Sequence, residues 1–60
     1  MTDDTGVPTA GYYAEVAASL NGWYSVHRWK DGEYRGMQHC ATIEFAYLVQ
    51  QTWEETGRGV

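Results

Sequence analysis

The chain has almost none of the residues that cross-link a protein or anchor it in a membrane. Among its 60 residues Cys40 is the one cysteine, so no disulfide can form within the chain. Cys40, His27 and His39 do not have the spacing of a structural zinc site. No apolar run approaches the ~20 residues that cross a bilayer, and the polar start is unlike a signal peptide. We therefore expect a soluble cytoplasmic protein without cofactor or metal.

Basic residues are also scarce. Four Lys and Arg against eight Asp and Glu give a formal charge of −4 at pH 7. Proteins that hold nucleic-acid phosphates normally carry an excess of Lys and Arg, whereas acidic proteins favour basic partners. The composition therefore favours a basic protein partner, with no direct nucleic-acid binding and no membrane.

Proline occurs once, at Pro8, in a first segment that has no aromatic residue. Residues 1–11 also contain two aspartates and two glycines, which predicts a flexible acidic leader. Tyrosine and tryptophan are plentiful from Tyr12 onwards. We expect residues 12–60 to form a single β-β-β-α domain.

Two dipeptides, Asn21-Gly22 and Asp31-Gly32, each lie between segments in which apolar and polar residues alternate. Such dipeptides are the strongest short-range signal for β-hairpins, because a type I′ turn needs φ > 0 at both central residues. The pattern predicts a three-stranded antiparallel meander from Tyr12 to Cys40.

Two-residue turns at both places also predict the register of the meander. They pair Ala18 with Ser25 and Trp29 with Tyr34, and side chains then alternate between two sides of the sheet. The side expected to form the core holds Tyr12, Ala14, Val16, Ala18, Leu20, Trp23, Ser25, His27, Trp29, Tyr34, Gly36, Gln38 and Cys40. The solvent-facing side is expected to hold Tyr13, Glu15, Ala17, Ser19, Tyr24, Val26, Arg28, Lys30, Glu33, Arg35, Met37 and His39.

The last part of the chain predicts a helix from Ile43 to Thr56 that covers the core side. Thr42 is a suitable N-cap, Glu44 suits the helix dipole and Gly57 is a suitable stop. The stripe expected to dock on the sheet is Phe45, Ala46, Val49 and Trp53, with Ile43, Tyr47 or Leu48 left partly open. The predicted fold class is α+β, a three-stranded antiparallel β-meander followed by one C-terminal helix packed on one sheet face.

No arrangement in the sequence is typical of an enzyme. Neither histidine has a serine or cysteine placed as an activated nucleophile, and Cys40 should point to the opposite side from His39. Glu54 and Glu55 diverge on a helix, and the glycines match no phosphate-binding loop. We expect no catalytic residue, with His27 in the core and Cys40 as a buried thiol.

The order of elements, with Trp29-Lys30-Asp31-Gly32-Glu33-Tyr34-Arg35 at the second hairpin, resembles the small arm-site DNA-binding domain of tyrosine recombinases. In that family the sheet enters the major groove of DNA. The resemblance covers residues 12–56 and implies a nucleic-acid-binding sheet face. The groove-facing residues would be Tyr24, Arg28, Lys30 and Arg35.

In size and composition the chain is similar to small phage-encoded inhibitors of host defence, anti-CRISPR proteins especially. Members of that group commonly bind a defence complex and block its nucleic-acid channel, some as acidic DNA mimics. The similarity implies a non-enzymatic inhibitor that docks on a nucleic-acid-binding complex in the host cytoplasm.

The inhibitor hypothesis places the contact on acidic and aromatic residues. Carboxylates at the hairpin tip and on the helix would steer association, and aromatic side chains would anchor it. The expected partner-binding residues are Asp31, Glu33, Glu44, Glu54, Glu55, Tyr13, Tyr24, Tyr47 and Trp53. Two alternatives stay open, namely a small DNA-binding domain that uses the sheet and a homodimeric structural module that uses surplus apolar helix surface.

Overall fold

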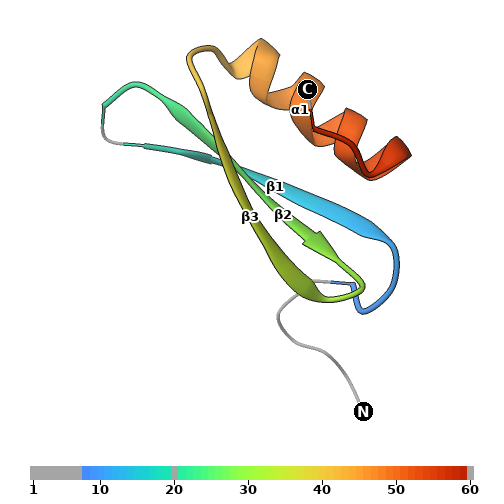
Figure 1. Cartoon of the computed structure of the whole chain (residues 1–60). Coiled ribbons are helices and arrows are strands. Elements are labelled where there is room, and N and C mark those ends of the chain that lie inside the picture. Colours follow the sequence, from blue (N-terminus) through green and yellow to red (C-terminus); the bar gives the residue numbers. More distant parts are fainter. Residues whose placement is uncertain (1–7, 20, 60) are drawn as a thin grey trace.

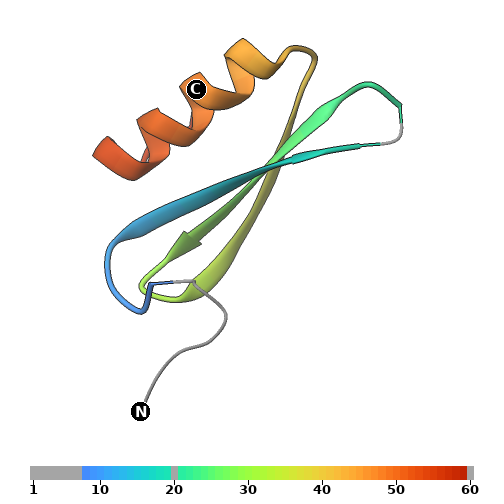
Figure 2. The same cartoon turned by 180° about the vertical axis from the view of Figure 1, so that it is seen from behind.

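The computed structural model describes residues 8–19 and 21–59, and it contains one sheet and one helix (Figure 1). Strands β1 (Tyr12–Ala18), β2 (Tyr24–Lys30) and β3 (Glu33–Cys40) are antiparallel in the order β1-β2-β3. Helix α1 (Ile43–Thr56) follows and lies across one side of the sheet, mainly over β1 (Figures 1 and 2). The predicted fold class is confirmed. The first seven residues of the expected leader, and Leu20, lie outside the described residues.

The second hairpin has the predicted turn. Asp31 has φ 53° and Gly32 has φ 82°, so both central residues are left-handed as a type I′ turn requires. Trp29 pairs with Tyr34 directly beside it. The Asp31 N–H donates to the Gly11 carbonyl at 2.8 Å, and the Asp31 carboxylate accepts from the Gly11 N–H at 2.7 Å. The chain that enters β1 is thus tied to this turn.

The first hairpin differs from the prediction by one residue. The Ser19 N–H donates to the Trp23 carbonyl at 2.8 Å, which leaves residues 20–22 between them. Gly22 is left-handed with φ 79°. A three-residue connection with a left-handed last residue is the next most common hairpin loop. Because side chains alternate, the one-residue slip places those of β2 on the opposite side.

A β-bulge in β3 introduces a second shift of register. Trp29 pairs with Tyr34, but Arg28 pairs with Gly36, so Arg35 is the extra residue. Gly36 has φ 101°, a conformation that suits glycine. The two shifts cancel beyond the bulge. Strand β1 and the end of β3 therefore have the predicted sides, whereas β2 and the start of β3 are reversed.

Helix α1 begins and ends where the sequence predicts. The Thr42 hydroxyl accepts from the Phe45 N–H at 3.1 Å, which caps the first turn. Gly57 has φ 73°, and its N–H donates to the Trp53 carbonyl at 2.7 Å. These local contacts set the length of the helix.

The core lies between α1 and the sheet. Its buried residues are Ala14, Val26, Cys40, Ala46, Val49 and Trp53, with Val16, Tyr24 and Ile43 packed against them. Val26 was expected on the solvent-facing side, and that prediction is wrong because β2 is reversed. Phe45, expected to dock on the sheet, is 36% exposed because it lies at the margin of the buried helix stripe.

Candidate partner-binding surfaces

Within residues 8–19 and 21–59, no three His, Cys, Asp or Glu side chains come together in a way that could hold a metal ion. The helix in this part of the chain is too short and too polar to cross a bilayer. Cys40 is buried, and burial raises the pKa of its thiol, which disfavours the nucleophilic thiolate. The expectation that the protein is not an enzyme stays a prediction.

The residues of the DNA-binding alternative do not share an uncovered face. Because β2 is reversed, Tyr24, Arg28 and Lys30 lie on the side that α1 covers. The Arg28 guanidinium lies over the Trp53 ring, 5.5 Å from its centroid, and Lys30 Nζ lies 5.7 Å from the centroid of Tyr12. The prediction that these three residues lie on the solvent-facing side is therefore wrong.

The two arginines of that set are engaged within the domain. Arg28 Nε is buried and has no hydrogen-bond partner among the described residues. Its guanidinium is held by the indole ring instead, as a cation–π contact. Arg35, at the bulge, pairs with Glu33 at 3.3 Å.

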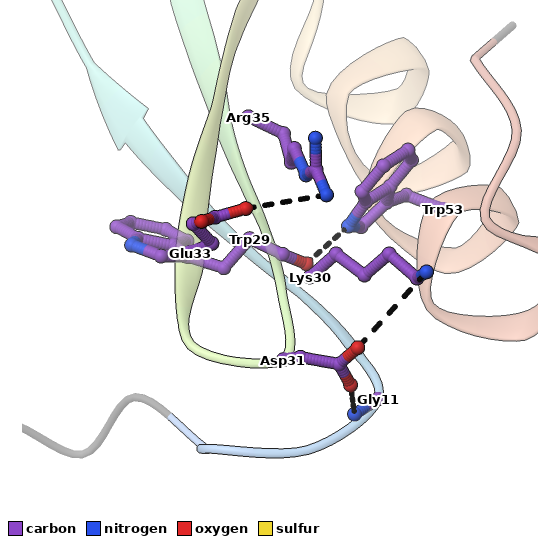
Figure 3. A network of polar contacts seen from close by, with 7 residues as sticks. All are labelled: Gly11, Trp29, Lys30, Asp31, Glu33, Arg35 and Trp53. Atoms are coloured by element: carbon purple, nitrogen blue, oxygen red, sulfur yellow. Dashed lines mark hydrogen bonds and ion pairs between the residues drawn. The ribbon is translucent and has the colours of Figure 1, made fainter.

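Trp53 belongs to the core. Its side chain is 9% exposed, and its indole N–H donates to the Trp29 carbonyl at 2.9 Å (Figure 3). Tyr12 meets the ring edge to face, with 5.1 Å between centroids. The helical period places Trp53 on the sheet side, so little of its ring is open to solvent, and its expected contact with a partner stays a prediction.

Glu54 completes the hydrogen bonding of an edge strand. Its carboxylate accepts from the Ala14 N–H at 3.1 Å, and Gln50 donates its side-chain amide to the Ala14 carbonyl at 3.0 Å. Ala14 lies in β1, at one edge of the sheet, where peptide groups lack a strand partner. The Glu54 carboxylate is therefore engaged in holding α1 to β1, a role that is separate from its predicted one of steering a partner.

The acidic residues of the second hairpin are paired with bases close by. Asp31 lies 4.0 Å from Lys30 Nζ, and Glu33 pairs with Arg35 (Figure 3). Exposed pairs of this kind stabilise little, but each base offsets the field of its carboxylate. The hairpin tip is thus less acidic in effect than the sequence suggests.

The outward side of α1 keeps the remaining predicted residues exposed. This outer helix surface consists of Glu44, Tyr47, Leu48, Gln51 and Glu55. Tyr47 is 57% exposed and Leu48 is 49% exposed, between the two carboxylates. Gln51 donates to Glu55 at 3.1 Å along the same side. The outer helix surface therefore presents Tyr47 and Leu48 to solvent, with Glu44 before them and Glu55 after them along the helix.

The side of the sheet away from α1 forms a second surface. This open face consists of Tyr13, Glu15, Ala17, Ser25, His27, Trp29, Tyr34, Met37 and His39. Ser25, His27, Trp29 and Tyr34 were expected in the core, and that prediction is wrong because β2 and the start of β3 are reversed. Figure 3 shows the Trp29 side chain on the opposite side of the sheet from Trp53.

Tyr13 lies on the open face as the sequence predicts. Its hydroxyl donates to the Glu15 carboxylate at 2.8 Å. This hydrogen bond is the main reason that the pKa of Tyr13 is raised above its ordinary value. The carboxylate of the open face thus already accepts a hydrogen bond from a neighbouring hydroxyl.

A shallow hollow continues the open face toward the first hairpin. It has a volume of about 280 Å³ and is lined by Ser19, Asn21, Trp23, Ser25 and His39. Trp23 is 50% exposed there, and the lining contains no Asp, Glu, Lys or Arg.

The outer helix surface and the open face remain as candidate sites. They lie on opposite sides of the domain, and each carries exposed aromatic rings. The spacing of residues along the helix predicts the outer helix surface. Trp29 and Tyr34 of the open face were instead predicted to lie in the core. Comparisons of the chain with family models, with curated proteins and with solved structures give no match.

Proposed function

We propose that the protein is a non-enzymatic inhibitor that docks through the outer helix surface on a nucleic-acid-binding complex and blocks its nucleic-acid site. The observation that carries the proposal is the exposure of Tyr47 and Leu48 between Glu44 and Glu55. An apolar centre with a polar rim is the usual anatomy of a protein interface. Aromatic side chains such as Tyr47 are frequent anchors at the centre of such contacts.

Charge supports a basic partner. Helix α1 carries Glu44, Glu54 and Glu55 but no Lys, Arg or His, and the chain has a formal charge of −4. Complementary charge mainly accelerates association, while the buried anchors slow dissociation. A surface that binds nucleic acid is basic because it must hold phosphates, so it is the kind of partner that this helix suits.

The similarity in size and composition to phage-encoded anti-CRISPR proteins supports a host-defence complex as the target. The carboxylates of α1 would then stand in for phosphates of the nucleic acid that the complex binds. Such an inhibitor would act in the cytoplasm of the host cell.

The experiment uses guide-loaded CRISPR effector complexes and surface plasmon resonance across a salt series. Glu44→Lys and Glu55→Lys should each slow association by about three- to tenfold and reduce its salt dependence. Tyr47→Ala should mainly raise the dissociation rate, by about tenfold. An electrophoretic shift of target DNA by the complex should be lost when the wild-type protein is added.

Glu15→Lys is the matched control, because it makes the same charge change on the open face. If it slows association as much as Glu44→Lys, net charge and not the outer helix surface governs binding, and the proposed surface is wrong. If Tyr47→Ala instead converts a dimer to a monomer in sedimentation, the homodimeric alternative is favoured.

A further inference from the structure

Asn21 is the one asparagine of the chain, and a glycine follows it. The dipeptide lies in the first hairpin loop, between the end of β1 at Ala18 and the start of β2 at Tyr24. Asn21 and Gly22 are both exposed. A β-carbon placed on Gly22 would meet no atom within 4 Å among the described residues beyond its chain neighbours. The space around this peptide group is therefore open.

We infer that Asn21 is a site of spontaneous deamidation, a modification that turns its side-chain amide into a carboxylate. Asparagine is one of the thermolabile residues of proteins. The inference goes beyond the proposed function and does not depend on it, because Asn21 lies in the first hairpin loop and not on α1.

The reaction needs only water in addition to the chain itself. The Gly22 backbone nitrogen loses its proton and attacks the side-chain carbonyl carbon of Asn21. A C–N bond forms, the amide nitrogen takes up that proton and leaves as ammonia, and a five-membered succinimide ring results. Water then adds to one of the two ring carbonyls and opens the ring to aspartate or to isoaspartate. The net change is one ammonia lost and one water gained, without oxidant or reductant.

The residue and the backbone at position 22 both favour the attack. Glycine has no β-carbon to obstruct the approach of its nitrogen to the Asn21 side chain, and it has the widest choice of backbone angles. Gly22 has φ 79°. The pairing of β1 with β2 ends at Ala18 and Tyr24, so no ladder of the sheet restrains this dipeptide.

The second hairpin contains the related dipeptide Asp31-Gly32 in a protected setting. Aspartate can close the same ring with loss of water and reopen it as isoaspartate. The Asp31 carboxylate, however, accepts from the Gly11 N–H at 2.7 Å, and Lys30 Nζ lies 4.0 Å from it. A β-carbon on Gly32 would meet the Thr9 Cα at 3.4 Å, so the chain that enters β1 packs against this turn. The fold therefore protects the second dipeptide and leaves the first open.

Deamidation would change the shallow hollow beside the first hairpin. Asn21 is part of its lining, which contains no Asp, Glu, Lys or Arg. The new carboxylate would be the first charge of that kind there and would make the formal charge of −4 more negative by one. Isoaspartate would also add a carbon to the backbone of a loop that the Ser19 N–H and the Trp23 carbonyl close at 2.8 Å. The product thus differs from the original chain in charge and in shape.

The test incubates the full chain at mildly alkaline pH, either folded in buffer or unfolded in guanidinium chloride. Peptide mass mapping follows the gain of about 1 Da at position 21, and isoaspartyl methyltransferase labels isoaspartate at positions 21 and 31. Asn21 should react in the folded chain at a rate within about tenfold of that in the unfolded chain, because exposed loops open at little cost. Asp31 should be slowed by more than about tenfold on folding, since it must first release its hydrogen bond.

Asn21→Gln is the matched control. It keeps a side-chain amide, but its longer side chain has to close a six-membered ring, so the reaction at position 21 should be lost over the same period. Gly22→Ala, shown to be folded by circular dichroism, should slow the reaction severalfold because its methyl group obstructs the attack. The inference is overturned if position 21 gains mass only in the unfolded chain, or if folding protects Asn21 as strongly as Asp31. Ammonia release that persists in Asn21→Gln would also overturn it, because the reacting amide would then belong to a glutamine.

Discussion

The ring of Tyr12 occupies the place that a β-carbon on Gly57 would take. Gly57 ends α1 with φ 73°, and Tyr12 is the first residue of β1. Tyr12 also meets Trp53 edge to face, so the start of the sheet, the core and the helix C-cap are in contact at one point. The two ends of the domain are thus joined by packing, although no disulfide links them.

Gly57→Ala should therefore be strongly destabilising. The substitution meets both a left-handed backbone, which costs about 1 kcal/mol for alanine, and a steric overlap that costs about 1–3 kcal/mol more. Urea unfolding should show a loss of about 2–4 kcal/mol. Gly59→Ala is the control, because Gly59 is not in the left-handed region and its β-carbon would meet only Arg28 Nη1 at 3.4 Å. Equal stability of the two variants would contradict this packing.

Gly32→Val should damage the second hairpin. Gly32 has φ 82°, which a β-branched residue resists at a cost of about 1–3 kcal/mol. Gly32→Asn should cost less, because asparagine tolerates left-handed backbone. Thermal melts followed by circular dichroism compare the two. An unchanged melting temperature for Gly32→Val would mean that the type I′ turn is not formed in solution.

Glu54→Ala should lower stability more than Glu55→Ala. Glu54 accepts from the Ala14 N–H at the edge of the sheet, whereas Glu55 accepts only from Gln51 on the solvent side. Loss of a charged acceptor of a backbone N–H costs about 1–2 kcal/mol, and loss of the surface contact costs about 0.5 kcal/mol or less. Urea unfolding of both variants measures the difference. A larger loss for Glu55→Ala would show that the edge contact is not stabilising.

Stability should fall at alkaline pH through the thiol of Cys40. Burial raises the pKa of this thiol above 9.0, so the folded state holds the proton more tightly than the unfolded state does. The resulting stabilisation is present below the unfolded pKa and is lost as the pH rises through the folded pKa. The free energy of unfolding should fall more steeply above pH 9.0 in the wild type than in Cys40→Ala. Parallel curves for the two proteins would contradict a buried, neutral thiol.

The parts of the fold that the sequence predicts correctly are those set by local contacts. Thr42 and Gly57 specify the helix ends through their own backbone and side chain, and Asp31-Gly32 specifies its turn. Asn21-Gly22 is less informative, because a glycine at that place suits both a two-residue turn and a longer loop with a left-handed last residue. The bulge at Arg35 has no local signal beyond the glycine that follows it.

The same distinction separates the two candidate surfaces. Tyr47 and Leu48 could be placed from helical spacing, which depends on α1 alone. Trp29 and Tyr34 were paired correctly, yet their side of the sheet depends on how many residues lie in a distant loop. One residue more in that loop places Trp29, expected in the core, on the open face, where it is half-buried.

The bulge in β3 has a consequence for self-association as well as for register. Strand β3 is the sheet edge that α1 contacts least, whereas Gln50 and Glu54 bond to the peptide groups of Ala14 on the other edge (Figure 1). A sheet edge without a neighbouring strand can template the addition of a strand from another molecule. The extra residue Arg35, followed by Gly36 with φ 101°, breaks the even spacing of N–H and C=O groups that such a strand would need, and it adds a charge there. The bulge that returns the end of β3 to its predicted side therefore also makes this edge a poor template for a strand from another molecule.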